Sequence, residues 1–170
     1  MGALRRKLTR AGLPGLLVTH LPDLRYLCGF TGSSAALAVT RRTARMFTDG
    51  RYKTQAAEEV KAARVEIVTS SPAGAAVQWL AAQPGVEMAG FDPIRTTVAD
   101  LANWKAVLPY RLRRSFLSAL PAAFVEPLRR KSRRHHARSR RPRGTASQPR
   151  RSASQAFPNS SLSPASSVIS

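Results

Sequence analysis

The apolar residues of this 170-residue chain are concentrated before residue 129, and this distribution limits which part of it can fold. Residues 129–170 contain nine apolar residues and eleven serines, with eleven Lys and Arg and no Asp or Glu. Such a segment cannot bury enough apolar surface to offset the entropy lost on ordering. Roughly half of residues 1–128 are apolar, which is enough for one hydrophobic core. We therefore expect one globular domain followed by a disordered basic tail.

The net charge of +19 is divided in the same uneven way. Residues 1–128 hold 17 basic and 9 acidic side chains, a net charge of +8, whereas residues 129–170 contribute +11. A tail of this kind attracts polyanions with a steep dependence on salt. It offers no aromatic residue for base stacking before Phe157 and no recognisable nucleic-acid-binding module. It therefore predicts non-specific polyanion binding, without specific recognition of nucleic acid.

Several classes of protein are disfavoured by simple counts. The single cysteine, Cys28, excludes an internal disulfide and a multi-cysteine metal site. No apolar run approaches the roughly 18–20 residues that span a bilayer. Arg5 and Arg6 resemble the start of a signal peptide, but Arg10 and Pro14 interrupt the apolar segment that should follow. We expect a cytoplasmic protein that is not bound to a membrane.

Hydrophobic periodicity predicts an α/β fold with a mixed β-sheet flanked by helices. A hairpin is expected where a polar connection, residues 40–43, joins two short apolar runs. Ser71 and Thr97 have the sequence context of helix N-caps. The expected helices cover residues 3–11, 22–27, 51–62, 73–82 and a segment beginning at residue 98, and the expected strands cover residues 16–18, 35–39, 44–48, 65–68, 86–91 and 110–116.

Two spaced motifs carry a resemblance to a known family. Residues 16–37, LLVTHLPDLRYLCGFTGSSAAL, and residues 47–52, FTDGRY, closely resemble the N-terminal domain of Xaa-Pro aminopeptidases and dipeptidases, also called the creatinase N-terminal domain. Residues 54–60 and 90–92 match the same pattern, and Asp23 departs from it where the family more often has Asn. The resemblance covers about residues 3–130. It implies a ribonuclease H-like α/β domain over residues 1–120.

The resemblance continues through residues 121–131, which match the family's linker and the start of its catalytic domain, and it stops at Ser132. In the family that domain holds two divalent metals, such as Mn²⁺, through two Asp, one His and two Glu. No Asp or Glu follows Glu126, although a two-metal hydrolase needs several carboxylates. We therefore expect no catalytic residue, no metal ligand and no bound cofactor in this chain. The abrupt change suggests that a frameshift produced residues 132–170.

Arg51 and Tyr52 are the candidate substrate-facing residues. The resemblance implies that they approach the active site of a partner subunit, so that Arg51 helps to enclose one end of the substrate. It also implies a homodimer formed through this domain. The alternative is structural: Asp49 caps the following helix and Tyr52 packs inward. The sequence leaves both interpretations open.

Other conspicuous residues are more simply explained by structure. The loop at residues 29–34 lacks the lysine and the glycine spacing of phosphate-binding loops, so its glycines are expected to serve a turn. His20 is expected to be structural or exposed, and Cys28 to be a small buried residue. The pair His135 and His136 is expected to lie in a solvated tail.

Two functions remain open at this stage. The first is a non-catalytic N-terminal domain of an Xaa-Pro peptidase, which would be called a peptidase only by descent. The second is a non-enzymatic association domain whose basic tail binds polyanions.

Overall fold

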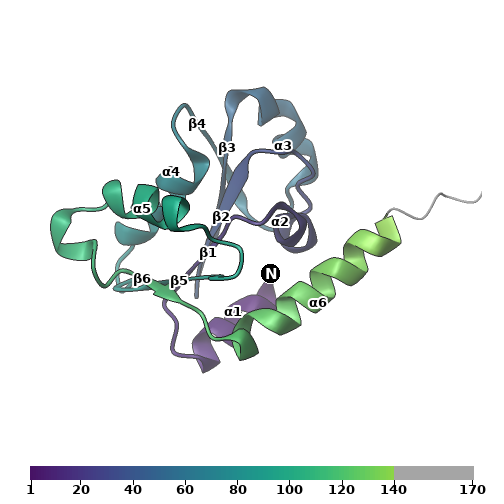
Figure 1. The fold of residues 1–170 in the computed structure, drawn as a ribbon. Coiled ribbons are helices and arrows are strands. Elements are labelled where there is room, and N and C mark those ends of the chain that lie inside the picture. Colours follow the sequence, from purple (N-terminus) through teal and green to yellow (C-terminus); the bar gives the residue numbers. More distant parts are fainter. Residues whose placement is uncertain (140–170) are drawn as a thin grey trace, which may run out of the picture.

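The computed structural model describes residues 1–139, which form a six-stranded mixed β-sheet with helices on both faces (Figure 1). The strand order is β4-β3-β2-β1-β5-β6. Strand β2 pairs antiparallel with β1 and β3, whereas β3–β4, β1–β5 and β5–β6 are parallel pairs. The mixed sheet predicted from the sequence is confirmed. The strands are β1 (Gly15–Val18), β2 (Ala35–Thr40), β3 (Ala44–Asp49), β4 (Arg64–Val68), β5 (Ala89–Phe91) and β6 (Leu117–Ala119).

The two faces of the sheet carry separate hydrophobic clusters. Leu37 and Val39 of β2 lie in the cluster shared with α1 (Gly2–Arg10), α2 (Leu21–Cys28), α3 (Lys53–Glu59) and α6 (Ala122–Ser139). Ala36 and Ala38 lie in the other cluster, with α4 (Pro72–Ala81) and α5 (Val98–Ala106). Successive strand residues point to opposite faces, which explains this division.

Helix α4 and helix α5 begin where the sequence predicts. The Ser71 side chain accepts a hydrogen bond from the Gly74 N–H, at 3.3 Å. Thr97 and Asp100 form the reciprocal capping box, with two side chain to backbone hydrogen bonds of 3.0 Å. These bonds satisfy N–H groups that the first turn of a helix leaves without partners.

Three elements differ from the sequence prediction. The helix expected over residues 51–62 is a 3₁₀ turn, Gly50–Tyr52, followed by the shorter α3, because Val60 is already extended. The strand expected over residues 86–91 is confined to β5, since the Val86 N–H donates to Gln83 in a turn.

The third difference is the strand expected over residues 110–116, which is wrong for most of its length. Tyr110–Leu112 form a 3₁₀ turn, and β6 begins only at Leu117. The guanidinium of Arg113 donates to the Leu108 carbonyl and so supports the turn. Tyr110 is 86% exposed and supplies no inward-facing residue for a strand.

Helix α6 crosses the predicted boundary between the linker and the tail. Residues 121–131 were expected to be a linker, and the tail was expected to be disordered from residue 132, but one helix spans Ala122–Ser139. It packs against α2 along a stripe of side chains at helical spacing, of which Leu128 is half-buried and the others are buried: Phe124, Val125, Arg129 and Ser132. Residues 140–170 of the expected tail lie outside the described part of the chain. Within residues 1–139, no helix has the length and apolar character needed to cross a membrane.

Substitution of Gly29 tests the packing of the loop that follows α2. Gly29 has a φ of +93°, and a Cβ there would lie 2.7 Å from the backbone oxygen of Glu59. Gly12 also has a positive φ, +68°, but a Cβ there meets nothing within 4 Å. We expect Gly12→Ala to lower the free energy of unfolding by about 1 kcal/mol and Gly29→Ala by about 2–4 kcal/mol. Urea denaturation followed by circular dichroism measures both, and equal losses would contradict the proposed close contact.

Candidate functional site

Asp49 holds Arg51 at the carboxyl end of β3. The Asp49 carboxylate accepts the Arg51 backbone N–H at 3.1 Å and two guanidinium hydrogen bonds at 3.0 Å. The hydrogen bonds from Arg51 lower the pKa of Asp49 to about 2. The Arg51 side chain nevertheless remains 75% exposed. The guanidinium is therefore oriented by a neighbouring carboxylate and presented to solvent, and the capping role expected for Asp49 is confirmed.

Tyr52 is half-buried between the loop after α2 and Arg51, whose guanidinium carbon lies 5.6 Å from the centroid of the Tyr52 ring. Its ring meets Phe30 edge-on with centroids 5.6 Å apart, and its hydroxyl lies 2.6 Å from the Ser33 Oγ. A Cβ on Gly32 would lie 2.3 Å from the Phe30 ring and 2.7 Å from the Tyr52 ring. The glycine loop is therefore a packing element, as the sequence indicated, and Tyr52 anchors it.

The same loop is fixed to α3 by polar contacts. Glu59 accepts the Thr31 backbone N–H at 2.7 Å and the Thr31 hydroxyl at 2.6 Å. Gln55 donates to both Thr31 and Glu59, at 2.8 and 3.1 Å. The end of the domain that carries Arg51 is thus held by contacts from α3 and from the loop after α2.

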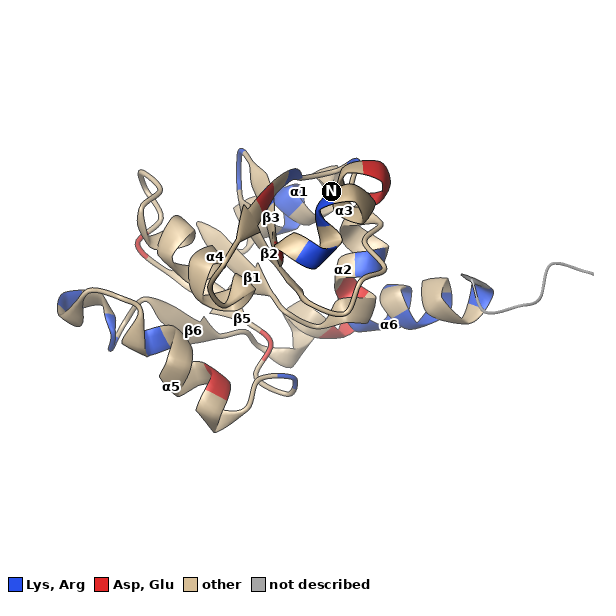
Figure 2. Cartoon of the chain, turned by 90° about the horizontal axis from the view of Figure 1, so that it is seen from above, with Lys and Arg blue, Asp and Glu red and all other residues tan. Residues whose placement is uncertain are grey.

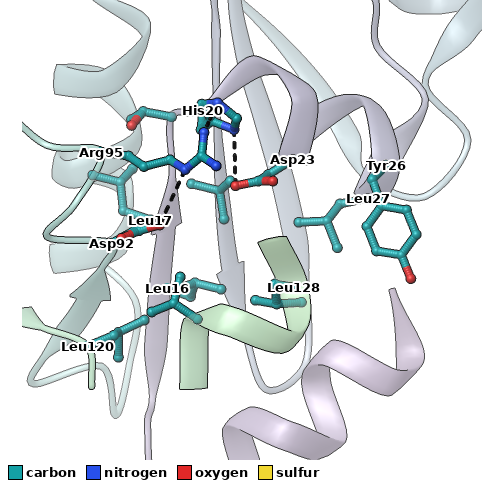
Figure 3. Close-up of a pocket in the computed structure, with 13 residues that line it drawn as sticks. Leu16, Leu17, His20, Asp23, Tyr26, Leu27, Asp92, Arg95, Leu120 and Leu128 are labelled. Atoms are coloured by element: carbon teal, nitrogen blue, oxygen red, sulfur yellow. Dashed lines mark hydrogen bonds and ion pairs between the residues drawn. The ribbon is translucent and has the colours of Figure 1, made fainter. Parts of the chain in front are cut away.

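A second group of charged residues lies at the carboxyl ends of β1 and β5 (Figure 3). Arg129 of α6 donates to both oxygens of Asp92, through Nε at 2.8 Å and through Nη2. These hydrogen bonds raise the pKa of Arg129. Arg95 approaches the same carboxylate at 3.7 Å and also contacts the His20 ring. Asp92 therefore connects the carboxyl end of β5 to α6.

The contact with Arg95 favours the neutral form of His20. An arginine side chain has no acceptor, so the His20 Nε2 must accept from Arg95, and the ring proton must reside on Nδ1, 3.2 Å from Asp23. Burial lowers the pKa of His20; Asp23 opposes this effect, and the Arg95 guanidinium reinforces it. His20 is structural, as expected, and it has the partners that the sequence alone did not reveal.

The cavity between this group and α6 is too small for an organic ligand. Its volume is about 30 Å³, and its walls include Leu16, Leu120, Val125 and Leu128 around the carboxylate of Asp23. That volume is enough for about two water molecules. His20 and Arg95 also line a separate, open pocket of about 700 Å³, whose other walls include Ser71, Asp100 and Trp104.

The structure also places the remaining candidate residues. Cys28 is buried, donates to the Leu24 carbonyl at 3.2 Å, and has its pKa raised by burial, as expected of a small core residue. His135 was expected in a solvated tail, but it lies on α6 with its ring 5.8 Å from that of Tyr26, because α6 packs against α2.

The folded part of the chain matches one family over most of its length. The family model described as the Creatinase/Prolidase N-terminal domain matches residues 1–129. The chain belongs to this family. The creatinase N-terminal domain fold also occurs in the N-terminal domain of the cytoplasmic peptidase PepQ from Mycobacterium tuberculosis H37Rv. That domain has a TM-score of 0.64 and 32% identity, and the match covers 75% of this chain and 95% of that chain.

Two further proteins are similar to this creatinase N-terminal domain. Aminopeptidase P, an Xaa-Pro aminopeptidase from Streptococcus thermophilus, has a TM-score of 0.63 and 27% identity, with 74% of this chain and 92% of that chain covered. The peptidase YqhT of Bacillus subtilis (strain 168) is 32% identical over 108 residues, which are 62% of this chain and 30% of that protein. The chain thus spans under one third of the length of this curated relative.

The metal chemistry of a related enzyme does not fit the described residues. The X-prolyl aminopeptidase of Caenorhabditis elegans, a structure with the same fold at 24% identity and a TM-score of 0.53, is described as having a di-nuclear active site. Within residues 1–139 of this chain, no group of three or more His, Cys, Asp or Glu could hold a metal ion. The two carboxylates of the charged group already have partners in the protein. Asp23 faces His20, and Asp92 faces Arg95 and Arg129.

Asp92→Asn tests whether the contact with Arg129 stabilises the domain. Only 9% of the Arg129 side chain and 17% of the Asp92 side chain are exposed, so removal of the carboxylate leaves a largely buried cation without its main partner. We expect a loss of about 2–3 kcal/mol in the free energy of unfolding. The control is Glu66→Gln, which breaks the more exposed pair with Arg45 and should cost less than about 1 kcal/mol. Urea denaturation compares the two, and equal small losses would contradict the stabilising role.

His20 predicts a dependence of stability on pH. Because its pKa is lower in the folded than in the unfolded protein, the unfolded chain binds the proton more readily. The stabilisation is therefore present above the unfolded value of about 6.5 and is lost as the pH falls towards the folded value. We expect His20→Gln to reduce the loss of stability between pH 8 and pH 5, measured by urea denaturation at each pH. The same pH dependence in both proteins would contradict this role of His20.

Proposed function

We propose that the chain acts as the non-catalytic N-terminal domain of an Xaa-Pro peptidase and that Arg51 faces the substrate. The observation that carries the proposal is the exposed guanidinium of Arg51, oriented by Asp49 at the end of β3. The names of the similar proteins, an Xaa-Pro aminopeptidase and PepQ, supply the substrate class. Hydrolysis itself and its two divalent metals belong to a catalytic domain in this account.

The chemistry of Arg51 suits one end of a peptide. Asp49 engages the Nε and Nη2 atoms of Arg51, while Nη1 forms no hydrogen bond within residues 1–139 and remains free to donate. A guanidinium donor pairs well with a carboxylate or carbonyl oxygen. Tyr52 contributes indirectly, because its contacts with Ser33 and Phe30 hold the turn that carries Arg51.

A homodimer formed through this domain is part of the proposal. Arg51 lies at the edge of its own domain, so it can enclose a substrate only if a catalytic domain, from the same or a partner subunit, lies against that edge. A cytoplasmic location accords with the description of PepQ as a cytoplasmic peptidase.

A chimeric peptidase tests the role of Arg51. Residues 1–129 would replace the N-terminal domain of PepQ, which was crystallised as an isolated domain and therefore folds independently. We expect Arg51→Ala to lower kcat/KM for an Xaa-Pro dipeptide about tenfold, mainly through KM, as the loss of a charge-assisted hydrogen bond does. The matched control, Lys53→Ala, removes an exposed charge two residues away and should change kcat/KM less than twofold.

Two results would contradict the proposal. The first is equal kcat/KM for the Arg51 and Lys53 variants of an active chimera. The second is hydrolysis of the same dipeptide by the purified 170-residue chain with added Mn²⁺, since that would place catalysis in this chain itself.

A further inference from the structure

A basic groove lies on the folded domain, at the amino-terminal ends of β3 and β4. It has a volume of about 510 Å³. Its walls come from α1, the β2–β3 hairpin, the segment before β4 and the end of α4, and no acidic residue lines it. The cations that line it are Arg5, Arg42, Arg45, Lys61 and Arg64.

Within the described part of the chain, four of these five cations form no ion pair. Arg45 pairs with Glu66 at 2.5 Å. Within residues 1–139, none of the other four forms an ion pair with a carboxylate, and Arg42, Lys61 and Arg64 are exposed. Figure 2 shows Lys and Arg on α1, the helix that contributes Arg5 to the groove. Charges of one sign in a concave site reinforce each other's field and attract anions.

The lining of the groove favours nucleic acid over other anionic partners. Protein interfaces have an apolar centre, but the apolar walls here are alanines and Trp79, whose ring is covered by the Arg45 guanidinium at 5.1 Å. A concave surface also fits a flat bilayer poorly. Interfaces with nucleic acid are polar and strongly positive, and arginines pair well with phosphate.

We propose that this groove binds the sugar-phosphate backbone of nucleic acid without reading its bases. Because Arg45 covers Trp79, the groove offers no free aromatic face for stacking bases, and duplex DNA should bind at least as tightly as single-stranded DNA. This site is distinct from the basic tail predicted from the sequence, because all five of its cations precede residue 129.

The groove also lies apart from the proposed substrate-facing end. It begins at the amino-terminal end of β3, whereas Arg51 follows its carboxyl end. Six residues of extended strand separate the two ends by about 20 Å. Nucleic-acid binding at the groove therefore does not depend on the peptidase role, and each can fail without the other.

The test compares two variants of the full chain that lose the same charge. Arg42→Ala/Arg64→Ala removes two exposed cations of the groove. Arg111→Ala/Arg114→Ala removes two exposed cations near β6, at the opposite edge of the sheet. The tail is identical in both, so its contribution cancels. Fluorescence anisotropy with a labelled 20-base-pair duplex DNA, titrated at several salt concentrations, gives the affinity and its salt dependence.

We expect the groove variant to bind about tenfold more weakly at 100 mM salt and to lower the slope of log K against log salt by about 2, the value for two lost phosphate contacts. The control variant should change the affinity less than threefold. Equal losses in the two variants would overturn the proposal, because they would mean that only net charge matters. A larger effect of the groove variant on acidic lipid vesicles or on a polyglutamate peptide than on DNA would also overturn it.

Discussion

The partly buried carboxylate of Asp92 is the contact on which the position of α6 in the domain depends. It lies at the carboxyl end of β5 and receives guanidinium groups from Arg129 on α6 and from Arg95 in the following loop. A largely buried charge is tolerated only when it is paired, so Asp92 and Arg129 each require the other. This requirement, together with the apolar stripe of α6, holds the part of α6 up to Ser132 against α2 and the rest of the domain.

The same principle of a paired carboxylate operates differently at the exposed end of β3. Asp49 orients Arg51 without burying it, so the guanidinium keeps an outward-facing donor. At the other end of the strand, Glu66 compensates only one of five cations. The two ends of β3 therefore present positive charge in different forms. The single oriented guanidinium of Arg51 suits one end of a peptide, and the open groove suits a phosphate backbone.

The parts of the structure that depend on local chemistry could be predicted from the sequence. The caps at Ser71 and Thr97, the hairpin between β2 and β3, and the packing role of the glycine loop depend on residues within a few positions of one another. The capping role of Asp49 was foreseen as one of two interpretations for the same reason.

The parts that depend on distant contacts could not be predicted. Asp92 and Arg129 are 37 residues apart, and no spacing rule connects them. Residues 121–131 were assigned to a linker by the family resemblance, and residues 132–170 to a tail by their basic composition. The buried face of α6 becomes evident only when α2 is beside it. The contact between His20 and Arg95 was missed for the same reason, since Arg95 lies 75 residues away, whereas Asp23, the other partner of His20, is only three residues away.

Native-state hydrogen exchange along α6 of the intact chain tests this account most directly. If Asp92 and the apolar stripe hold the helix to the domain, the amides of residues 128–132 are protected to an extent comparable with those of β1 and lose that protection first in Asp92→Asn. Exchange of these amides at the rate of an unstructured peptide, while β1 remains protected, would contradict it.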